Sequence, residues 1–403
     1  MAKKKEKDRD DKDLYAAIAE ETGGALFNDG GQIKYVIDTG SLALNFICSG
    51  KCIGGGIAGG KITEVFGPES SAKSLVSYSV LGACQRMGGK AVYLDCEFAG
   101  NAEFAEKCGH LDASKLFAFH PETYERVEKK VINVVKAIRK TWGSEVPILV
   151  VWDSIGVTMT ERELKELELP ENATKTAIKE AGGNEKPGER AKAAGKLLRK
   201  LNPFMDENNA TFFIINQTRA NIGVMYGDPD ITAGGGRALK YYASCRLAFA
   251  SSKQIKDEKR DVVVGVNLIM KNRKNRHFAP HMATKGVQLF FNQGINPLGG
   301  LLSVFIGAGR IETAGKGTYK VMEPWAGGQD IVFKGSVERN DVPLDLLLKC
   351  PALVDAKDEQ EVRDYMAVYS PALDIGNLDS LKEISTNEEE LLDDILEADG
   401  EGD

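Results

Sequence analysis

Four short runs rich in Val, Ile and Phe constrain the fold more than any other feature of this chain. They are KITEVF (61–66), KAVYLDCE (90–97), VPILVVWDS (146–154) and TFFIINQ (211–217). Amphipathic helical patterns separate each run from the next. Strands that are apolar on both faces and alternate with helices are typical of a parallel sheet covered by helices. The sequence therefore predicts an α/β fold with a largely parallel central sheet, whose ligand binds at the carboxyl ends of the strands.

The two ends of the 403-residue chain differ in composition from its middle. We predict a charged arm with a short helix at 13–22 (residues 1–37), a core at 38–284, a small α+β domain at 285–373 and an acidic tail at 374–403. The tail contains twelve acidic residues and one lysine, so its own charge is −11. The whole chain has a net charge of −7, and residues 1–373 therefore carry +4. Such a tail either keeps the protein in solution or competes with a polyanion for a basic surface.

Two polar segments interrupt the predicted core. Residues 158–192 are highly charged and are broken by Pro170, Pro187 and several glycines, and residues 218–237 are rich in glycine and contain one proline. Loops of this length inside a compact α/β domain are usually functional or disordered.

Hydropathy and the N-terminus argue against a membrane protein or an exported one. Hydrophobic residues make up 42% of the chain and charged residues 28%, and no stretch approaches the roughly 20 apolar residues that a bilayer span needs. The N-terminus has lysines but no apolar segment, and its acidic residues argue against an organelle transit peptide. We therefore expect a cytoplasmic protein without membrane contact.

Residues 67–74 read GPESSAKS and have the outline of the phosphate-binding P-loop, G-x-x-x-x-G-K-[ST], between a strand and a helix. Backbone N–H groups would hold phosphates, Lys73 would pair with their oxygens and Ser74 would ligate Mg²⁺. Ala72 stands where the pattern has glycine, and we expect it to have a negative φ, which alanine adopts freely. The alternative is a serine-rich turn without a ligand. The residues expected to hold the nucleotide are Gly67, Pro68, Glu69, Ser70, Ser71, Ala72, Lys73 and Ser74.

Two acidic residues follow other predicted strands. Asp153 ends one run, where a Walker-B aspartate holds the Mg²⁺ shell, and Glu97 ends another, where a carboxylate activates the attacking water. A single acid at a strand end is more commonly a helix cap or a surface residue. Three strand ends that converge on one edge instead favour a site that hydrolyses a nucleoside triphosphate.

Longer strings resemble the bacterial RecA recombinase family, from DTGSLALN (38–45) to GTYKV (317–321). The most specific string covers residues 215–247, which general P-loop ATPases do not carry. The resemblance implies a RecA-type ATPase core that uses ATP and Mg²⁺. It also implies helical filaments on single-stranded DNA, and pairing with homologous duplex DNA during recombination and repair. The other matching strings are GPESSAKS, YLDCEFA, VVWDS, RKLNPFM, MKNR and GINPLGGLLSVFIGAGRIETAG.

The resemblance also assigns roles to single residues around the nucleotide. Glu97 matches the glutamate that activates water, and Gln217 matches the glutamine that senses the γ-phosphate. Lys271 and Arg273 match two basic residues that reach the γ-phosphate of a neighbouring subunit, although Arg273 replaces a lysine. The helix at 13–22 would dock on the neighbouring subunit.

Two further matches concern the adenine base. Phe104 lies where the family stacks an aromatic ring near the base, and Asn101 replaces an aspartate that contacts the base. The nucleotide preference is therefore less closely defined by the resemblance than the phosphate contacts are.

In this family the segments at 158–192 and 218–237 correspond to loops that face DNA. Arginines in such loops meet phosphates, Met and Tyr side chains stack on bases, and glycines let the loop change shape. The first loop is longer than is usual in the family, so contacts inside it cannot be transferred. The DNA contacts that the resemblance implies are Arg199, Arg219, Met225, Tyr226, Gly234, Gly235, Gly236 and Arg237.

Two alternatives remain beside the recombinase interpretation. A hexameric helicase-type ATPase has the same fold, but the segments MKNR and GINPLGG argue against it. A DNA-coating scaffold that does not hydrolyse ATP is supported by Ala72 alone, whereas Lys73, Glu97 and Gln217 favour an active ATPase. An ATPase assay with and without single-stranded DNA separates the scaffold from the recombinase.

Overall fold

A computed structural model describes residues 14–18, 20–22, 33–167, 169–170, 188–220, 230–232, 235–257, 260–278, 282–335 and 342–369. It divides the chain into two compact units, Met1–Tyr35 and Val36–Asp403. In the first unit, residues 14–18 and 20–22 are helical, and the Thr22 hydroxyl donates to the Ile18 carbonyl at 2.7 Å. This confirms the short helix predicted at 13–22, except that residues 13 and 19 lie outside the described positions.

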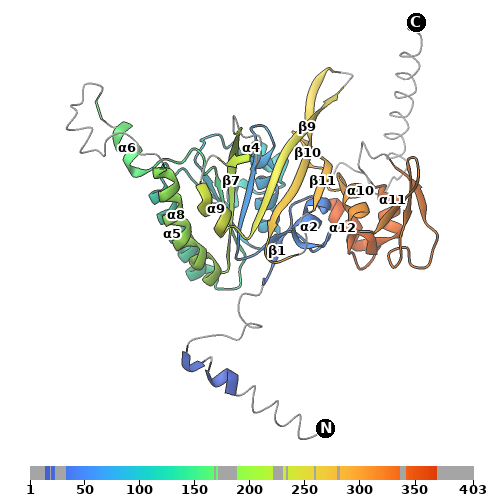
Figure 1. Cartoon of the computed structure of the whole chain (residues 1–403), viewed down its shortest axis with the longest axis horizontal. Helices are drawn as coiled ribbons and strands as arrows, with labels where there is room; N and C mark the ends of the chain where they lie inside the picture. The colour runs from blue at the N-terminus through green and yellow to red at the C-terminus, as the bar shows by residue number, and fades with distance from the viewer. Residues whose placement is uncertain are drawn as a thin grey trace. The chain divides into compact units, whose positions relative to one another are not determined.

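The second unit is built on a sheet of ten described strands in the order β12-β11-β10-β9-β3-β7-β6-β4-β5, with β8 paired to β7. The six strands β9, β3, β7, β6, β4 and β5 are mutually parallel, and the others pair antiparallel. The four predicted runs are β3, β4, β6 and β7, which confirms the α/β fold with a largely parallel sheet (Figure 1). Strand bounds are β1 (Val36–Ile37), β2 (Ile57–Ala58), β3 (Ile62–Gly67), β4 (Lys90–Asp95), β5 (Leu116–Phe119), β6 (Ile148–Asp153), β7 (Ala210–Ala220), β8 (Asp230–Thr232), β9 (Cys245–Asp257), β10 (Val262–Asn275), β11 (Ala283–Phe290) and β12 (Gly294–Ile295).

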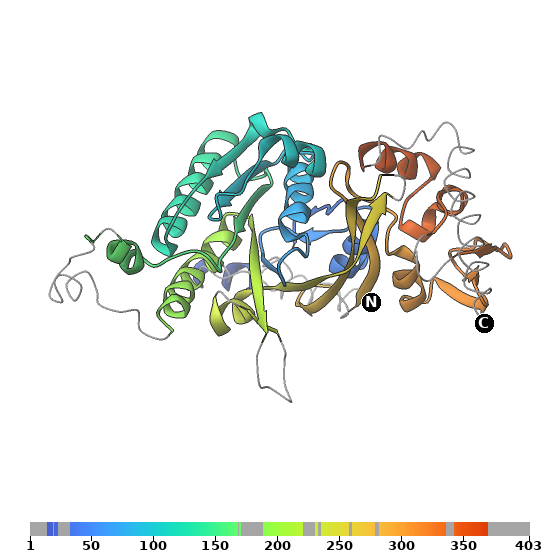
Figure 2. The same ribbon diagram turned by 90° about the horizontal axis from the view of Figure 1, so that it is seen from above.

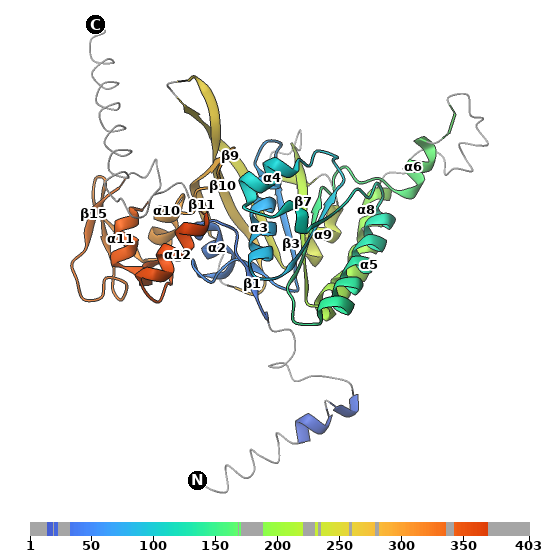
Figure 3. The same ribbon diagram turned by 180° about the vertical axis from the view of Figure 1, so that it is seen from behind.

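Helices cover both faces of this sheet, as the continuously apolar strands require. Figure 3 shows α3 and α4 on the face opposite to α8 and α9. None of the helices in the described part of the chain has the length and apolar character to cross a bilayer. The helices are α2 (Leu42–Ser49), α3 (Lys73–Arg86), α4 (Ala102–Gly109), α5 (Tyr124–Trp142), α6 (Glu161–Leu167), α8 (Glu189–Glu207), α9 (Gly236–Tyr242), α10 (Leu301–Gly307), α11 (Leu344–Lys349) and α12 (Glu359–Tyr369), with 3₁₀ turns η1 (Ala113–Lys115) and η2 (Pro351–Val354).

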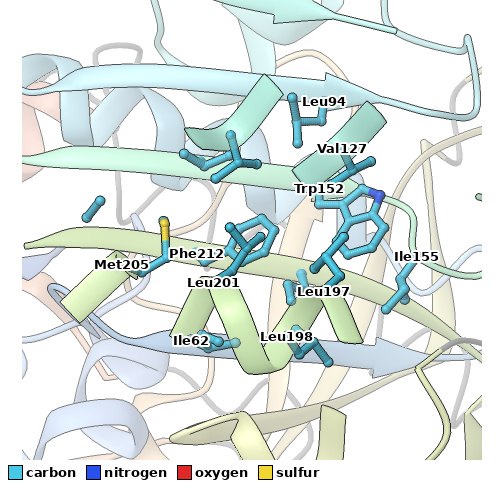
Figure 4. Packing of buried hydrophobic residues seen from close by; sticks show 14 of the residues in the cluster. Ile62, Leu94, Val127, Trp152, Ile155, Leu197, Leu198, Leu201, Met205 and Phe212 are labelled. Atoms are coloured by element: carbon cyan, nitrogen blue, oxygen red, sulfur yellow. The ribbon is translucent and has the colours of Figure 1, made fainter. Parts of the chain in front are cut away.

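The main core lies between the sheet and the helices α5 and α8 (Figure 4). Trp152 of β6 is fully buried and stacks on Phe212 of β7, with 5.9 Å between ring centroids and 6° between ring planes. Val127 of α5 and Leu197 of α8 belong to the same cluster. The indole N–H donates to the Thr158 hydroxyl at 3.1 Å, so this buried donor is satisfied. This core holds the strands that carry the candidate site.

The predicted boundary of the C-terminal domain, between 284 and 285, falls inside β11. β11 pairs with β10 and contributes the buried Val287 and Leu289 to the core, and the sheet continues to Ile295 in β12. A separate antiparallel sheet follows, made of β13 (Ile311–Gly315), β14 (Thr318–Val321) and β15 (Val332–Lys334). Figure 2 shows these orange strands and the red helices α11 and α12 beside the β11 end of the large sheet.

The first interrupting segment, predicted at 158–192, is shorter than expected because helices occupy both of its ends. α6 begins three residues into it, and α8 begins at Glu189. Arg162 donates to Glu189 at 2.9 Å, and Arg190 pairs with Glu163, so two crossed ion pairs tie the helices together. The charge of Arg190 is therefore already matched by a carboxylate. Residues 168 and 171–187 lie outside the described positions.

Arg310 connects the C-terminal turn η2 with helix α2, which precedes the large sheet in the chain. Its guanidinium is buried and donates to the Leu353 carbonyl at 2.6 Å and to Asp355 Oδ1 at 2.8 Å. Asp355 Oδ2 in turn accepts the backbone N–H of Cys52 at 2.8 Å. The guanidinium also lies over the Phe46 ring of α2, 4.7 Å from its centroid. One buried cation thus contacts both η2 and α2.

This geometry predicts that Arg310→Met lowers the free energy of unfolding by about 3 kcal/mol, because it leaves the Asp355 carboxylate and a buried carbonyl without their donor. Urea titration followed by tryptophan fluorescence measures the change. The matched control is Lys349→Met, because the Lys349–Asp345 pair is exposed (75% and 56% of the two side chains) and should contribute less than about 1 kcal/mol. Equal effects of the two substitutions would contradict the role given to Arg310.

Candidate functional site

A cavity of about 380 Å³ lies at the carboxyl ends of the central strands. Register explains why the residues meet there: Gly67 of β3 pairs with Gln217 of β7, and Asp95 of β4 pairs with Asp153 of β6. Parallel strands therefore end level with one another at this edge. The cavity is lined by Glu69, Ser70, Ser71, Ala72, Lys73, Ser74, Leu75, Glu97, Asp153, Ile215 and Gln217.

Lys73 is the cation of this cavity and is largely buried at the first position of α3. Its ammonium donates to the Pro68 carbonyl at 2.6 Å, to the Gly67 carbonyl at 3.2 Å and to the Ser71 hydroxyl at 3.2 Å. Burial lowers the pKa of Lys73, and the nearby carboxylates of Asp153, Glu97 and Glu69 oppose that shift. The side chain is thus held inside the loop, with its charge directed at the space that the loop surrounds.

The expectation that Ala72 has a negative φ is wrong. Ala72 has φ 58° and ψ 25°, and Ser70 has φ 57°, so two alternate residues of the loop are left-handed. Alternation of this kind turns backbone N–H groups toward a common centre and forms an anion-binding nest. Glycine adopts this conformation without cost, whereas alanine loses roughly 1–2 kcal/mol through its Cβ. Gly67 is required for another reason, because a Cβ there would lie 2.1 Å from the Phe249 carbonyl oxygen.

Asp153 ends β6 and is only 3% exposed. The Tyr93 hydroxyl donates to its Oδ2 at 2.9 Å. Burial raises the pKa of Asp153 to about 6; the carboxylates of Glu97 and Asp95 add to the shift, and hydrogen bonds from Ser74 and Tyr93 oppose it. Ser74 and Asp153 together offer a hydroxyl and a carboxylate oxygen, the ligand type that Mg²⁺ prefers. The donor set therefore fits a magnesium-bound phosphate ligand beside Lys73.

Glu97 lies two residues beyond the end of β4, which stops at Asp95 rather than at residue 97 as the sequence predicted. Its Oε1 accepts the Ser154 hydroxyl at 2.6 Å and the Gln217 side-chain amide at 3.3 Å. Glu97 is exposed and lines the cavity, and its carboxylate is directed by one donor directly after β6 and one in β7. This arrangement connects the candidate base directly to the candidate γ-phosphate sensor.

The predicted base-binding residues lie on α4 and do not line the described cavity. Asn101 is the N-cap of α4, where its Oδ1 accepts the backbone N–H of Phe104 at 2.9 Å. Asparagine and aspartate cap helices about equally well, so the replacement noted at this position keeps the local structure. Phe104 is 36% exposed. Contact of either residue with an adenine stays a prediction.

Lys271 and Arg273 are exposed on β10, on either side of the fully buried Asn272. The register of β10 with β9 shifts between Asn272 and Lys274, so Arg273 lies at an irregularity of the strand. β9 separates β10 from β3 in the sheet, and neither cation lines the cavity of its own chain. The structure thus leaves them on a surface where they could meet another subunit, and that role stays a prediction.

The predicted DNA contacts are only partly described. Arg199 is exposed on α8 and Arg237 is exposed on α9. Gly235 caps α9 at φ 76°, and a Cβ there would lie 2.8 Å from Leu239 Cβ, so the position requires glycine. Gly236, at φ 52°, begins the helix. Arg219 lies in β7 opposite Ile231, without a described side chain, and Met225, Tyr226 and Gly234 lie outside the described residues.

Several residues at the site were missed by the sequence analysis. Asp95 accepts the backbone N–H groups of Ala99 and Gly100 at 3.3 and 2.9 Å, and so shapes the turn that carries Glu97. Ser154 and Tyr93 direct the two carboxylates, as described above. Asp95 could have been predicted from its place at the end of a buried strand. No sequence pattern marks the hydroxyls of Ser154 and Tyr93, whose roles depend on the carboxylates beside them.

Comparison with known proteins supports the same grouping of motifs. Residues 24–296 match the family described as the RecA N-terminal domain. Protein RecA of Thermus aquaticus is 32% identical over 281 residues, which cover 70% of this chain and 74% of that protein. Protein RecA of Thermus thermophilus is 33% identical over 304 residues (74% and 81%), and that of Caulobacter sp. strain K31 is 32% identical over 336 residues (83% and 84%). The resemblance seen in the motifs is therefore confirmed, and the chain belongs to the bacterial RecA family.

Proposed function

We propose that this chain is a DNA-dependent ATPase that forms helical filaments on single-stranded DNA and pairs that DNA with homologous duplex DNA. One observation carries the proposal: a RecA-family chain brings Lys73, Ser74, Asp153, Glu97 and Gln217 to one cavity at the carboxyl edge of its sheet. This is the set of groups that phosphoryl transfer to water needs. The reaction would serve recombination and DNA repair in the cytoplasm.

In this proposal the P-loop binds the phosphates of ATP. The nest formed around Ser70 and Ala72 and the start of α3 supply backbone N–H donors. Lys73 exchanges its contacts with loop carbonyls for phosphate oxygens. Ser74 and Asp153 would hold Mg²⁺, and the ion would neutralise charge on the phosphates. Burial of the Lys73 ammonium strengthens its attraction to an anion, because the surroundings screen the charge poorly.

The proposed hydrolytic step uses Glu97 as the base. Its carboxylate takes a proton from a water molecule as that water attacks the γ-phosphorus, while the bond from that phosphorus to the bridging oxygen breaks and ADP leaves. The Ser154 hydroxyl, 2.6 Å away, and the Gln217 amide, 3.3 Å away, keep the carboxylate turned toward the cavity. Gln217 lies in β7, which leads into the second predicted DNA loop, so its side chain is suited to report phosphate occupancy to DNA.

The proposal of a filament rests on side chains that do not line the cavity of their own subunit. Lys271 and Arg273 would complete the site of a neighbouring subunit, where they would stabilise charge on the γ-phosphate. Leu14 and Ile18 of the N-terminal helix are 59% and 48% exposed. Since they lie four residues apart, they share one face of that helix and offer an apolar contact to another subunit.

The alternative of a non-hydrolysing scaffold is favoured by one observation, the left-handed Ala72. A cost of roughly 1–2 kcal/mol would weaken nucleotide binding by at most about 30-fold, and it leaves the base, the magnesium ligands and the sensor in place. The hexameric helicase alternative has no observation in its favour. An active recombinase ATPase therefore accounts for more of the site.

The test is ATP hydrolysis with and without single-stranded DNA, using Glu97→Gln as the decisive variant. We expect DNA to stimulate the wild-type chain, and the variant to lose at least about 100-fold in kcat, because the base is removed while shape is kept. ATP-dependent DNA binding should persist. Glu145→Gln, an exposed change before β6, is the control and should be unaffected. Wild-type DNA binding without any hydrolysis would select the scaffold instead.

Asp153→Asn should stabilise the nucleotide-free protein while abolishing magnesium-dependent nucleotide binding. With a folded pKa of about 6 against 3.8 for the ordinary group, the folded state binds the proton more tightly. The free energy of unfolding therefore falls as pH rises from about 4 to about 6, by up to about 3 kcal/mol. Denaturant titrations should show this gain for Asp153→Asn at pH 7.5 and none at pH 4. A variant that is less stable than wild type at pH 7.5 would contradict the assignment.

Ala72→Gly should bind ATP about as tightly as wild type, because the left-handed conformation of residue 72 already exists without the nucleotide and glycine adopts it freely. The free energy of unfolding should change by less than about 1 kcal/mol, since the glycine also gains freedom in the unfolded chain. Ala83→Gly, in the regular part of α3, is the control and should lose about 1 kcal/mol. Fluorescent-nucleotide titration and urea unfolding measure both, and a large loss of affinity in Ala72→Gly would refute the argument.

A further inference from the structure

Glu64 and Arg246 form a buried ion pair that does not line the cavity. They occupy paired positions on the adjacent strands β3 and β9, and they are 0% and 8% exposed. Arg246 Nε donates to Glu64 Oε2, and the guanidinium lies over the Phe66 ring, 4.5 Å from its centroid. The desolvation cost of burying two charges commonly cancels their attraction. Stability alone therefore does not account for this pair.

The second oxygen of Glu64 connects the pair to β7. Glu64 Oε1 accepts the side-chain amide of Asn216 at 2.9 Å, and Asn216 is fully buried. The Oδ1 of Asn216 accepts the backbone N–H of Gln217 at 3.0 Å. An asparagine amide has one donating end and one accepting end. A carboxylate at one end therefore dictates that the accepting end faces Gln217.

Gln217 is the residue on which this chain of contacts ends. It lies opposite Gly67, the first residue of the P-loop, and its side-chain amide reaches Glu97 Oε1 at 3.3 Å. Strand β7 continues from it to Ala220 and so includes the first residues of the segment at 218–237 that we predict to face DNA. A rotation of the Gln217 backbone would move its amide away from Glu97. The contacts of Asn216 oppose that rotation.

We propose that Glu64, Arg246 and Asn216 are positioning residues for Gln217: they orient the Asn216 amide, which holds the backbone from which Gln217 reaches Glu97. This inference rests on the proposed ATPase function. None of the three lines the described cavity, so each acts through Gln217 and not on the nucleotide. If Arg246 and Glu64 only stabilised the sheet, changes at Asn216 would alter stability without acting through Gln217.

The first test is a double-mutant cycle on DNA-stimulated ATP hydrolysis by the full chain. We expect Asn216→Leu to lower kcat at least tenfold with KM for ATP within threefold of wild type. Gln217→Ala should have a similar effect, and the double variant should be no more than twofold slower than Gln217→Ala alone. Thr63→Val is the control, because Thr63 is buried in β3 and its hydroxyl has no hydrogen-bond partner among the described residues, and it should keep the wild-type kcat. If Asn216→Leu does not fold, Asn216→Ser takes its place.

The second test removes the charges and keeps the orientation. In Glu64→Gln the side chain keeps one oxygen, and Arg246 donates to it. The Asn216 amide then loses its acceptor, and kcat should fall about tenfold. Adding Arg246→Met frees that oxygen for Asn216, and kcat should return to within threefold of wild type. A double variant as slow as Glu64→Gln, or losses that multiply in the first cycle, would overturn the positioning role. A wild-type chain that hydrolyses no ATP would overturn the proposed function, and this inference with it.

Discussion

The register of the parallel strands is the constraint on which the rest of the structure depends. Gly67 is level with Gln217, and Asp95 is level with Asp153, so four strands deliver their last residues to one edge. The stacked rings of Trp152 and Phe212 hold β6 and β7 in that register from within the core. A shift by one residue would exchange the two faces of a strand, so that side chains packed against one layer of helices would face the other layer. The cavity is therefore a consequence of how the core packs.

The sequence predicted the strands of this sheet correctly, because their burial on both faces requires apolar residues. Strands covered on both faces must be apolar throughout, so the runs at β3, β4, β6 and β7 were visible without structural information. A single acid at a strand end is more commonly a cap or a surface residue, but the ends of three such runs converge on one edge, and this convergence indicates the roles of Asp153 and Glu97. Family strings then supplied Gln217, whose place beside Glu97 no local pattern would have indicated.

The features that sequence reasoning missed depend on contacts between distant segments. The left-handed φ of Ala72 follows from the shape of the loop, and the pattern of residue types pointed instead to an ordinary helix start. β11 continues past the expected boundary because its pairing with β10 buries Val287. Arg310 gives no sign in the sequence that it is buried, since its partners at Phe46 and Asp355 are far away along the chain. Such contacts follow from tertiary packing alone.

Several features that lower the free energy of unfolding lie around the cavity where the nucleotide would bind. Lys73 is charged and buried, the carboxyl of Asp153 has a raised pKa, and Ala72 has an unfavourable backbone conformation. A phosphate beside Lys73 and a cation beside Asp153 would each compensate a charge that now lacks a full partner. Binding would thus relieve electrostatic costs that folding alone leaves in place, and part of the binding free energy would come from that relief. In a site of this kind, residues that destabilise the empty protein are the ones best suited to hold the nucleotide.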